Sequence, residues 1–224
     1  MAQKIIIYLS LILGAFLLIH NVYYYPLTAG YDSSIHAYYA DILTSQWRFP
    51  ALSETPEAYN PPFFYLMSGL LGRFYSQLTG LDFFSALKLW QYLNTIFAVL
   101  LIFFWYQVVK PILPKSKIFH YLFIGLIFSL PVFQKTIPMY NLELFSAFLI
   151  SLGFWYFIVH YQSKPTLLKT IILAAITVIN LLTRMSSFIL LITLLIGFVS
   201  LIYLKQNNRV QIIKFLTVFS LLIL

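Results

Sequence analysis

The sequence has no cysteine and very few acidic residues. Among 224 residues there is no Cys, and Asp and Glu together number 6. The absence of Cys excludes disulfides, thiolate metal centres and a cysteine nucleophile. Charged residues make up 9% of the chain and hydrophobic residues 61%, whereas an ordinary soluble domain carries roughly 25% charged residues. The composition therefore argues against a soluble domain, and we expect an integral membrane protein.

The basic residues outnumber the acidic ones. The chain has 14 Lys and Arg and a formal net charge of +8. In a soluble protein such a charge would suggest a nucleic-acid partner, but here most of the cations lie in short gaps between apolar runs. In that position they determine membrane topology. We therefore expect the membrane, and no nucleic acid, as the partner of these charges.

Eight apolar runs follow one another along the chain. They span residues 5–23, 63–78, 84–109, 119–133, 142–161, 167–182, 187–204 and 212–224. The second run is shorter than the ~20 residues that a span needs, contains Arg73 in its middle and opens with Pro61 and Pro62. We expect this run not to cross the membrane. The prediction is an all-α, polytopic transmembrane helical bundle of about seven spans.

This assignment separates the charges between the two sides of the membrane. The inter-span cations fall on the same side as Lys4, which the positive-inside rule makes cytoplasmic: Lys110, Lys115, Lys117, Lys164, Lys169, Lys205, Arg209 and Lys214. All six acids fall on the other side: Asp32, Asp41, Glu54, Glu57, Asp82 and Glu143. We therefore expect a cytoplasmic N-terminus and an active site on the outer face of the cell membrane.

The first outer loop, about residues 24–82, is expected to contain two interfacial helices. The first has an apolar stripe at helical spacing, formed by Ile35, Tyr38, Tyr39, Ile42 and Leu43. An amphipathic helix of this kind is expected to lie flat on the membrane and to end before Pro50. The second helix is expected to begin at Pro61 and Pro62. Because the chain ends inside an apolar run, we expect residues 1–224 to be a single module of a longer protein.

The outer loop also contains the first candidate site residues, Asp32 and His36. Asp32 is expected at the N-cap of the first loop helix, where it either only caps the helix or serves as a general base. His36 lies one turn later and is either hydrogen-bonded in the loop or paired with Asp32 as a metal ligand. Since neither Asp-x-Asp nor His-Glu-x-x-His occurs, we expect no cofactor, and the support for a divalent cation is weak.

Three further charged residues are expected on the same outer face. Glu143 starts a span, where the helix dipole favours an acid, but an acid in a membrane segment also suggests a function. Arg184 lies in a tight outer turn, where it either snorkels or binds a phosphate through its forked guanidinium. Lys135 is a further outer cation. Together with Asp32, these residues would suffice to move a group from a lipid phosphate to an acceptor.

Several of these features occur together in one known superfamily. They are Asp32 shortly after the first span, the stretch that contains His36, the segment Tyr59-Asn60-Pro61-Pro62 followed by aromatic residues, and Ala86-Leu87-Lys88-Leu89. The chain resembles the N-terminal half of the GT-C glycosyltransferases, with the protein O-mannosyltransferases and the polyprenyl-phosphate aminoarabinose transferases as the nearest members. The motif similarity covers about residues 30–65. Ser33 stands where many members have a second acid, which argues against the metal-dependent branch.

The resemblance implies an inverting membrane glycosyltransferase. Its donor would be a sugar linked to polyprenyl or dolichyl phosphate, and its acceptor a hydroxyl or amine of a lipid, glycan or protein. Asp32 would be the catalytic base and Glu143 would orient the acceptor. The implied substrate-binding residues are His36, Tyr59, Asn60, Lys135 and Arg184.

Two other classes of function remain open at this level. A membrane transporter would place Asp32, Glu143 and Arg184 along a pathway near the bilayer midplane. A non-catalytic membrane scaffold would need no site at all. The enzyme differs from both in requiring that these three residues meet in one outer cavity.

Overall fold

The computed structural model describes residues 2–112, 119, 127, 130–162, 165–203 and 209–223. Every regular element in these ranges is a helix, which confirms the all-α prediction. The elements are α1 (Ala2–Tyr24), α2 (Ser33–Ser45), the 3-10 helix η1 (Pro56–Tyr59), α3 (Phe63–Thr79), α4 (Phe83–Ala86), α5 (Lys88–Ile112), α7 (Pro131–Thr136), α8 (Glu143–Trp155), the π-helical turn η2 (Tyr156–Tyr161), α9 (Leu167–Leu181), the 3-10 turn η3 (Met185–Ser187), α10 (Phe188–Tyr203) and α11 (Arg209–Ile223).

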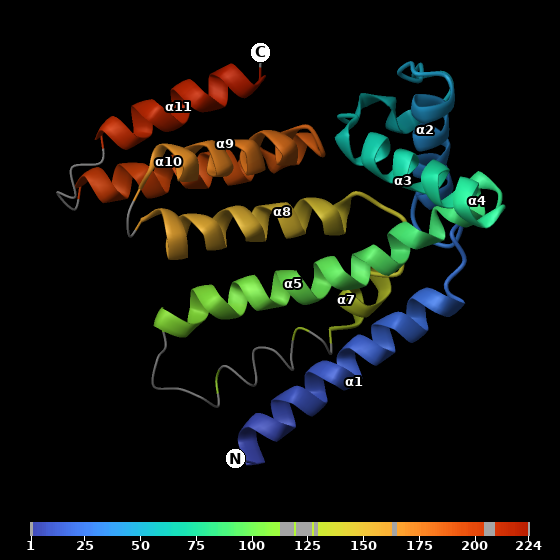
Figure 1. Cartoon of the computed structure of the whole chain (residues 1–224), viewed down its shortest axis with the longest axis horizontal. Helices are drawn as coiled ribbons and strands as arrows, with labels where there is room; N and C mark the ends of the chain where they lie inside the picture. Colours follow the sequence, from blue (N-terminus) through green and yellow to red (C-terminus); the bar gives the residue numbers. More distant parts are fainter. Residues whose placement is uncertain are drawn as a thin grey trace.

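The long helices lie side by side and the first loop covers one end of them. Figure 1 shows α5, α8, α9, α10 and α11 running along a common direction, with α1 set obliquely beside α5. Helices α2, α3 and α4 gather where α1 ends and α5 begins, and α2 runs across the common direction. Residues 24–82 therefore form a cap on one end of the helical layer, and we call this end the cap end.

Helices α2 and α3 exist as predicted, but α2 uses its apolar stripe differently. Of the five residues of the stripe, Tyr39, Ile42 and Leu43 are buried in the protein. Ile35 is half-buried and Tyr38 is 43% exposed. The stripe is covered because α2 packs closely on α3 at Gly69, where an added Cβ would lie 2.6 Å from Thr44 Cγ2. Most of the stripe therefore faces the protein, while the placement of α2 flat on the membrane stays a prediction. Periodicity identifies an apolar face but not what covers it.

Helix α3 does not qualify as a candidate membrane span, in agreement with the prediction for residues 63–78. Arg73 in its middle forms an ion pair with Asp41 of α2. The same guanidinium lies 4.3 Å from the ring centroid of Phe83 at the start of α4. The charged residue that made this run unsuitable for a span thus holds α2, α3 and α4 together.

Fewer helices qualify as spans than the sequence suggests. Within the described residues, Phe83–Lys110 and Glu143–Tyr161 are long and apolar enough to cross a membrane, and Ile12–Tyr24, Leu167–Leu181, Met185–Ser200 and Ile213–Ile223 are apolar but shorter. The prediction of about seven spans is therefore not met. A helix of fifteen residues such as α9 is about 22 Å long, less than the ~30 Å hydrocarbon layer. The runs 167–182, 187–204 and 212–224 are themselves shorter than the ~20 residues that a span needs.

The acids gather at one end of the molecule. The acids lie in the cap or at the start of α8, all at the cap end, whereas Lys110 and Lys169 lie at the opposite end, where α5 ends and α9 begins (Figure 1). Four cations used in the topology prediction lie outside the described residues: Lys115, Lys117, Lys164 and Lys205. Most of the predicted span 119–133 lies outside them too.

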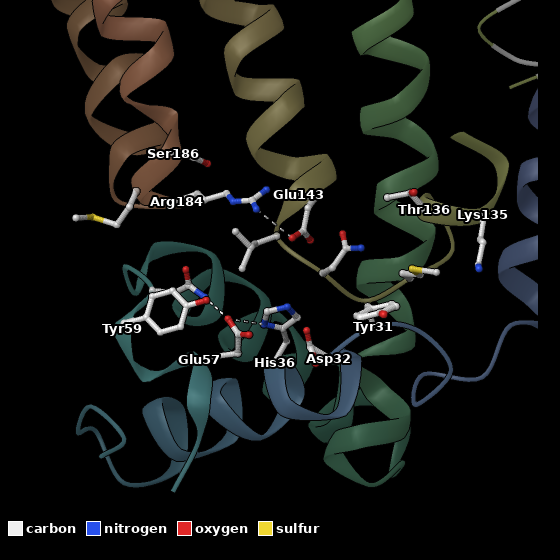
Figure 2. A pocket seen from close by; sticks show the side chains of 15 residues that line it. Tyr31, Asp32, His36, Glu57, Tyr59, Lys135, Thr136, Glu143, Arg184 and Ser186 are labelled. Atoms are coloured by element: carbon white, nitrogen blue, oxygen red, sulfur yellow. Dashed lines mark hydrogen bonds and ion pairs between the residues drawn. The ribbon is translucent and has the colours of Figure 1, made fainter. Parts of the chain in front are cut away.

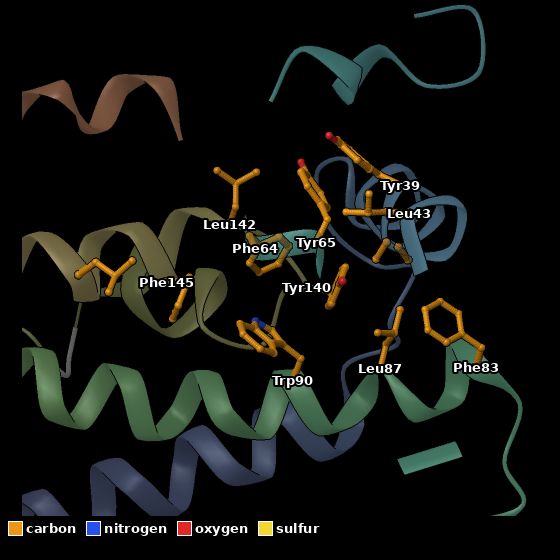
Figure 3. Close-up of a cluster of buried hydrophobic side chains, with 13 residues drawn as sticks. Tyr39, Leu43, Phe64, Tyr65, Phe83, Leu87, Trp90, Tyr140, Leu142 and Phe145 are labelled. Atoms are coloured by element: carbon orange, nitrogen blue, oxygen red, sulfur yellow. The ribbon is translucent and has the colours of Figure 1, made fainter. Parts of the chain in front are cut away.

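An aromatic core joins the cap to the long helices (Figure 3). Phe64 of α3 is completely buried, and its ring centroid lies 5.4 Å from that of Trp90 in α5 and 5.4 Å from that of Tyr140. Phe145 of α8 lies 5.4 Å from Trp90. Aromatic rings at such distances contribute to stability beyond the area they bury. The cap is therefore held rigidly against the starts of α5 and α8.

Candidate functional site

A polar pocket of about 690 Å³ lies between the cap and the cap-end turns of the long helices. Figure 2 shows its side chains converging from α2, η1, the end of α7, the start of α8 and the turn before η3. Fifteen residues line it: Tyr31, Asp32, His36, Glu57, Tyr59, Asn60, Lys135, Thr136, Met139, Asn141, Leu142, Glu143, Arg184, Met185 and Ser186. All seven residues predicted for the site are among them: Asp32, His36, Tyr59, Asn60, Lys135, Glu143 and Arg184.

Asp32 occupies the N-cap position of α2 but does not cap the helix. Its side chain forms no cap hydrogen bond, so the one of its two predicted readings in which Asp32 only caps the helix is wrong. Its backbone adopts the left-handed conformation with φ 57°, which Asp tolerates better than most residues at some cost. Strained backbone of this kind is concentrated at functional sites. The carboxylate is exposed and lines the pocket, so it is available to a ligand.

The wall opposite α7 is built by the turn around η1. Thr55 Oγ1 accepts a hydrogen bond from the Glu57 N–H at 3.3 Å, and Pro56 occupies the first turn. Asn60 is extended, with φ −74° and ψ 143°, as expected for a residue before proline. The Asn60 side-chain amide donates to Glu57 Oε2. The predicted residues Tyr59 and Asn60 are therefore brought to the pocket together with Glu57, which was not predicted.

A buried hydrogen-bond network lies beneath this wall. His36 Nδ1 is 2.9 Å from the Tyr65 hydroxyl and 4.0 Å from Glu57 Oε2. The Tyr65 ring stacks on Tyr39 at a centroid distance of 3.8 Å, and the Tyr39 hydroxyl donates to the Asn60 carbonyl at 3.1 Å. Buried polar groups that pair in this way rigidify their surroundings. His36 is thus hydrogen-bonded within the cap, as one of its two predicted readings had it.

Burial shifts the proton affinities of this network. Desolvation lowers the pKa of His36 below 6.5, although Glu143 and Asp32 act to raise it and Arg184 acts to lower it. Desolvation, Asp32 and Glu143 together raise the pKa of Glu57, while Arg184 and the hydrogen bond from Asn60 oppose the rise. Burial and the charge of Glu57 raise the pKa of Tyr65 far above its usual value. Burial therefore shifts all three groups toward their neutral forms relative to the same groups in water.

Glu143 and Arg184 face each other across the pocket. Glu143 Oε1 and Arg184 Nη2 are 3.5 Å apart, and both side chains are about two-fifths exposed, at 42% and 38%. Ser146 Oγ in α8 bonds Asn180 Oδ1 in α9 at 3.1 Å and Ser187 Oγ at 2.8 Å, which fixes the start of α8 against the turn that carries Arg184. The guanidinium retains donors for a ligand, since one of its nitrogens makes this contact.

Lys135 and Thr136 come from the end of α7 on another side of the pocket. The loop after α7 is held by α5, because Asn94 Nδ2 donates to the carbonyls of Ile137 and Met139 at 3.2 and 2.9 Å. Gln91 Nε2 donates to the Pro138 carbonyl at 2.6 Å. These buried amides satisfy irregular backbone, as a loop packed against helices requires.

An apolar groove of about 510 Å³ adjoins the polar pocket. Thr136 and Glu143 line both cavities. The groove lies between α5, α7 and α8, and its other lining residues are apolar: Leu101, Trp105, Ile127, Leu130, Val132, Phe133, Ile137, Leu144 and Ala147. A ligand that filled both cavities would be polar at one end and apolar at the other.

Sequence reasoning missed several residues that line the pocket. They are Tyr31, Glu57, Thr136, Met139, Asn141, Leu142, Met185 and Ser186. Glu57 lies two residues before Tyr59, within the stretch that carried the family resemblance, so its acidic character was the available signal. Tyr31 directly precedes Asp32 and is 87% exposed. No pattern in the sequence distinguished the others.

Within the described part of the chain, no group of three His, Cys, Asp or Glu residues is arranged to hold a metal ion. Asp32, His36, Glu57 and Glu143 line the same pocket, but no three of these described side chains are placed to hold an ion together. The chain matches no protein-family model, no curated protein and no solved structure.

Proposed function

We propose that the protein is a membrane glycosyltransferase that moves a sugar from a polyprenyl or dolichyl phosphate to a hydroxyl or amine of a lipid, glycan or protein acceptor. One observation carries the proposal: an acid-lined polar pocket with two cations shares Thr136 and Glu143 with an apolar groove. A lipid-linked sugar has this division into an ionic head and an apolar chain. The resemblance of residues 30–65 to GT-C enzymes supports the same class.

Asp32 is the general base of the proposed reaction. Its carboxylate takes the proton of the acceptor as the acceptor atom attacks the anomeric carbon. The bond from that carbon to the phosphate oxygen breaks, and the electron pair leaves with the polyprenyl phosphate. Because the phosphate is a good leaving group, one base suffices. The single displacement inverts the anomeric configuration. The Asp32 side chain is free for this role, because it does not cap α2.

Arg184 and Lys135 are the proposed phosphate ligands. The guanidinium can present two donors to one phosphate, while the ammonium of Lys135 adds a point charge. Glu143 keeps Arg184 in place through the 3.5 Å contact and lies where pocket and groove meet. From this position it can orient the acceptor beside the phosphate. His36, Tyr59 and Asn60 complete the wall around the sugar.

The apolar groove accommodates the first isoprene units of the donor. It extends along α5 from the pocket toward Trp105 and along α8 toward Ala147, so the chain would leave the pocket parallel to the long helices. We place these helices across the membrane with the cap on the outer face. Exposed apolar side chains on α1 and α10 support this placement, among them Phe16, Ile192, Ile196 and Val199.

The test is transfer from radiolabelled polyprenyl-phosphate sugars in membranes that contain the protein. The wild type should release polyprenyl phosphate and label an endogenous acceptor, and Asp32→Asn should abolish both. Asp82→Asn is a matched control, because Asp82 is also an outer N-cap Asp, it lies outside the pocket, and Asn can still accept the bond from Ser85 N. Equal loss in both variants, or no transfer by the wild type with any donor, would refute the proposal.

A further inference from the structure

Glu57 lines the pocket between Tyr59 and His36 (Figure 2). We propose that Glu57 is a substrate-binding residue whose carboxylate atom Oε1 accepts a hydrogen bond from a sugar hydroxyl. The inference rests on the proposed glycosyltransferase function and adds a specificity-determining residue to it. The hydroxyl belongs either to the transferred sugar or to a sugar of the acceptor, and the experiment below distinguishes the two.

The carboxylate is anchored through one of its two oxygens. The contacts described for Glu57 fall on Oε2, which accepts from the Asn60 amide and lies 4.0 Å from His36 Nδ1. The side chain is 12% exposed, so its position is set by the protein. Oε1 keeps its lone pairs for a ligand, because a carboxylate offers about four acceptor sites and Asn60 uses one.

A rigid supporting shell stands behind this carboxylate. Tyr65 is fully buried and Tyr39 is 1% exposed, and they hold His36 and Asn60 through the stacked rings and the hydrogen bonds given above. Burying two phenols, an imidazole and an amide is costly unless each finds a partner. A shell of this kind beside a pocket positions a binding group more precisely than a free side chain could. Its position behind Glu57 indicates that the orientation of this carboxylate matters.

The surroundings of Glu57 favour a neutral hydroxyl over an ionic group. Asp32 and Glu143 act on Glu57 as neighbouring negative charges, so a phosphate here would be repelled and belongs with Lys135 and Arg184. The ring of Tyr59 is 67% exposed and lies on the same wall. A carboxylate acceptor beside an exposed aromatic ring suits a sugar, which offers hydroxyl donors and an apolar ring face.

The experiment compares Glu57→Gln with a matched control, Glu54→Gln. Glu54 lies three residues earlier on the same turn, pairs with Arg48 at 2.6 Å and does not line the pocket. Binding of a polyprenyl-phosphate sugar and of sugar-free polyprenyl phosphate is measured in lipid nanodiscs without acceptor, and transfer is measured in parallel with varied acceptor. Charge-assisted hydrogen bonds of this kind correspond to roughly tenfold to a hundredfold in affinity.

If Glu57 binds the transferred sugar, Glu57→Gln loses that factor in its preference for the sugar-bearing lipid. If Glu57 binds the acceptor, the preference stays and the acceptor KM rises by the same factor. Glu54→Gln should change neither quantity by more than about twofold. A Glu57→Gln protein with unchanged sugar preference and unchanged acceptor KM overturns the inference, even where transfer proceeds normally.

Tyr65→Phe keeps the inference testable if Glu57→Gln does not fold. The substitution preserves the stacked ring and removes the hydroxyl that contacts His36, so it should weaken the same parameter by a smaller factor, and no change overturns the inference. If the wild type prefers the sugar-bearing lipid, Glu57→Gln loses this preference and no transfer occurs, only the proposed function is refuted. Wild-type protein that neither transfers nor distinguishes the two lipids refutes both.

Discussion

Glu143 Oε1 lies 3.5 Å from Arg184 Nη2, so the first residue of α8 meets the turn between α9 and α10 inside the polar pocket. The two residues are 41 positions apart in the sequence. Both side chains are partly exposed, and exposed ion pairs of this kind contribute only about 0–1 kcal/mol to stability. The pair therefore matters more for holding the Arg184 guanidinium in the pocket than for the stability of the protein.

The first prediction concerns Arg184. Arg184→Ala should lower the specificity constant for the donor by about tenfold to a hundredfold, because charge-assisted hydrogen bonds to the phosphate are lost. Arg184→Lys should lower it less, since the charge remains and the forked geometry does not. Kinetics with varied donor measure both values, and thermal unfolding should shift little. If the two variants show the same small effect, Arg184 does not bind the phosphate.

The second prediction concerns the backbone of Asp32. Its left-handed conformation costs a residue with a side chain roughly 1–2 kcal/mol, and glycine is free of this cost but loses more entropy on folding. Asp32→Gly should therefore leave the protein as stable as the wild type or up to about 1 kcal/mol more stable, yet inactive. Thermal unfolding in detergent and the transfer assay measure the two effects. A clear loss of stability would contradict the absence of a structural role for this side chain.

The third prediction concerns pH. Burial lowers the pKa of His36, so the unfolded chain binds the His36 proton at higher pH than the folded protein does. This residue therefore contributes a loss of stability that begins as the pH falls through about 6.5 and is complete below the lowered pKa. His36→Asn, which stays neutral and keeps an acceptor near Tyr65, should lose less stability between pH 7.5 and 5 than the wild type.

Glu57 supplies the control for this pH dependence, because its raised pKa acts with the opposite sign. The folded protein binds the Glu57 proton at higher pH than the unfolded chain, so this group adds stability as the pH falls toward about 4.5. Glu57→Gln should therefore make the acid-induced loss steeper. Unfolding midpoints across the same pH range decide the matter, and parallel curves for all three proteins would contradict both assignments.

The fourth prediction concerns the orientation in the membrane. Because the chain has no Cys, each introduced cysteine is the only thiol of the chain. Leu52→Cys places it in the cap, where Leu52 is 72% exposed, and Lys110→Cys places it near the far end of α5. A membrane-impermeant maleimide should label the first variant on intact cells and the second only after permeabilisation. The reverse pattern would place the pocket on the cytoplasmic side.

Local features of the sequence were sufficient for the elements of the cap. The apolar spacing after Ser33 and the pair Pro61-Pro62 predicted α2 and α3, because side-chain periodicity and the missing proline N–H act over a few residues. Arg73 and the length of its run also indicated that α3 is not a span. The charge distribution separated the acids from Lys110 and Lys169, which the fold places at opposite ends.

Only the tertiary structure decided how the site is assembled. Periodicity gave α2 an apolar face, but the partner of that face depends on Gly69, which lets α3 approach. The convergence of Asp32, Glu143 and Arg184 depends on packing between helices far apart in the chain, as in the bond from Phe63 N–H to the Leu182 carbonyl at 2.9 Å. Glu57 joins the site because a short turn and a buried network orient it. Such long-range contacts leave no periodic pattern in the sequence.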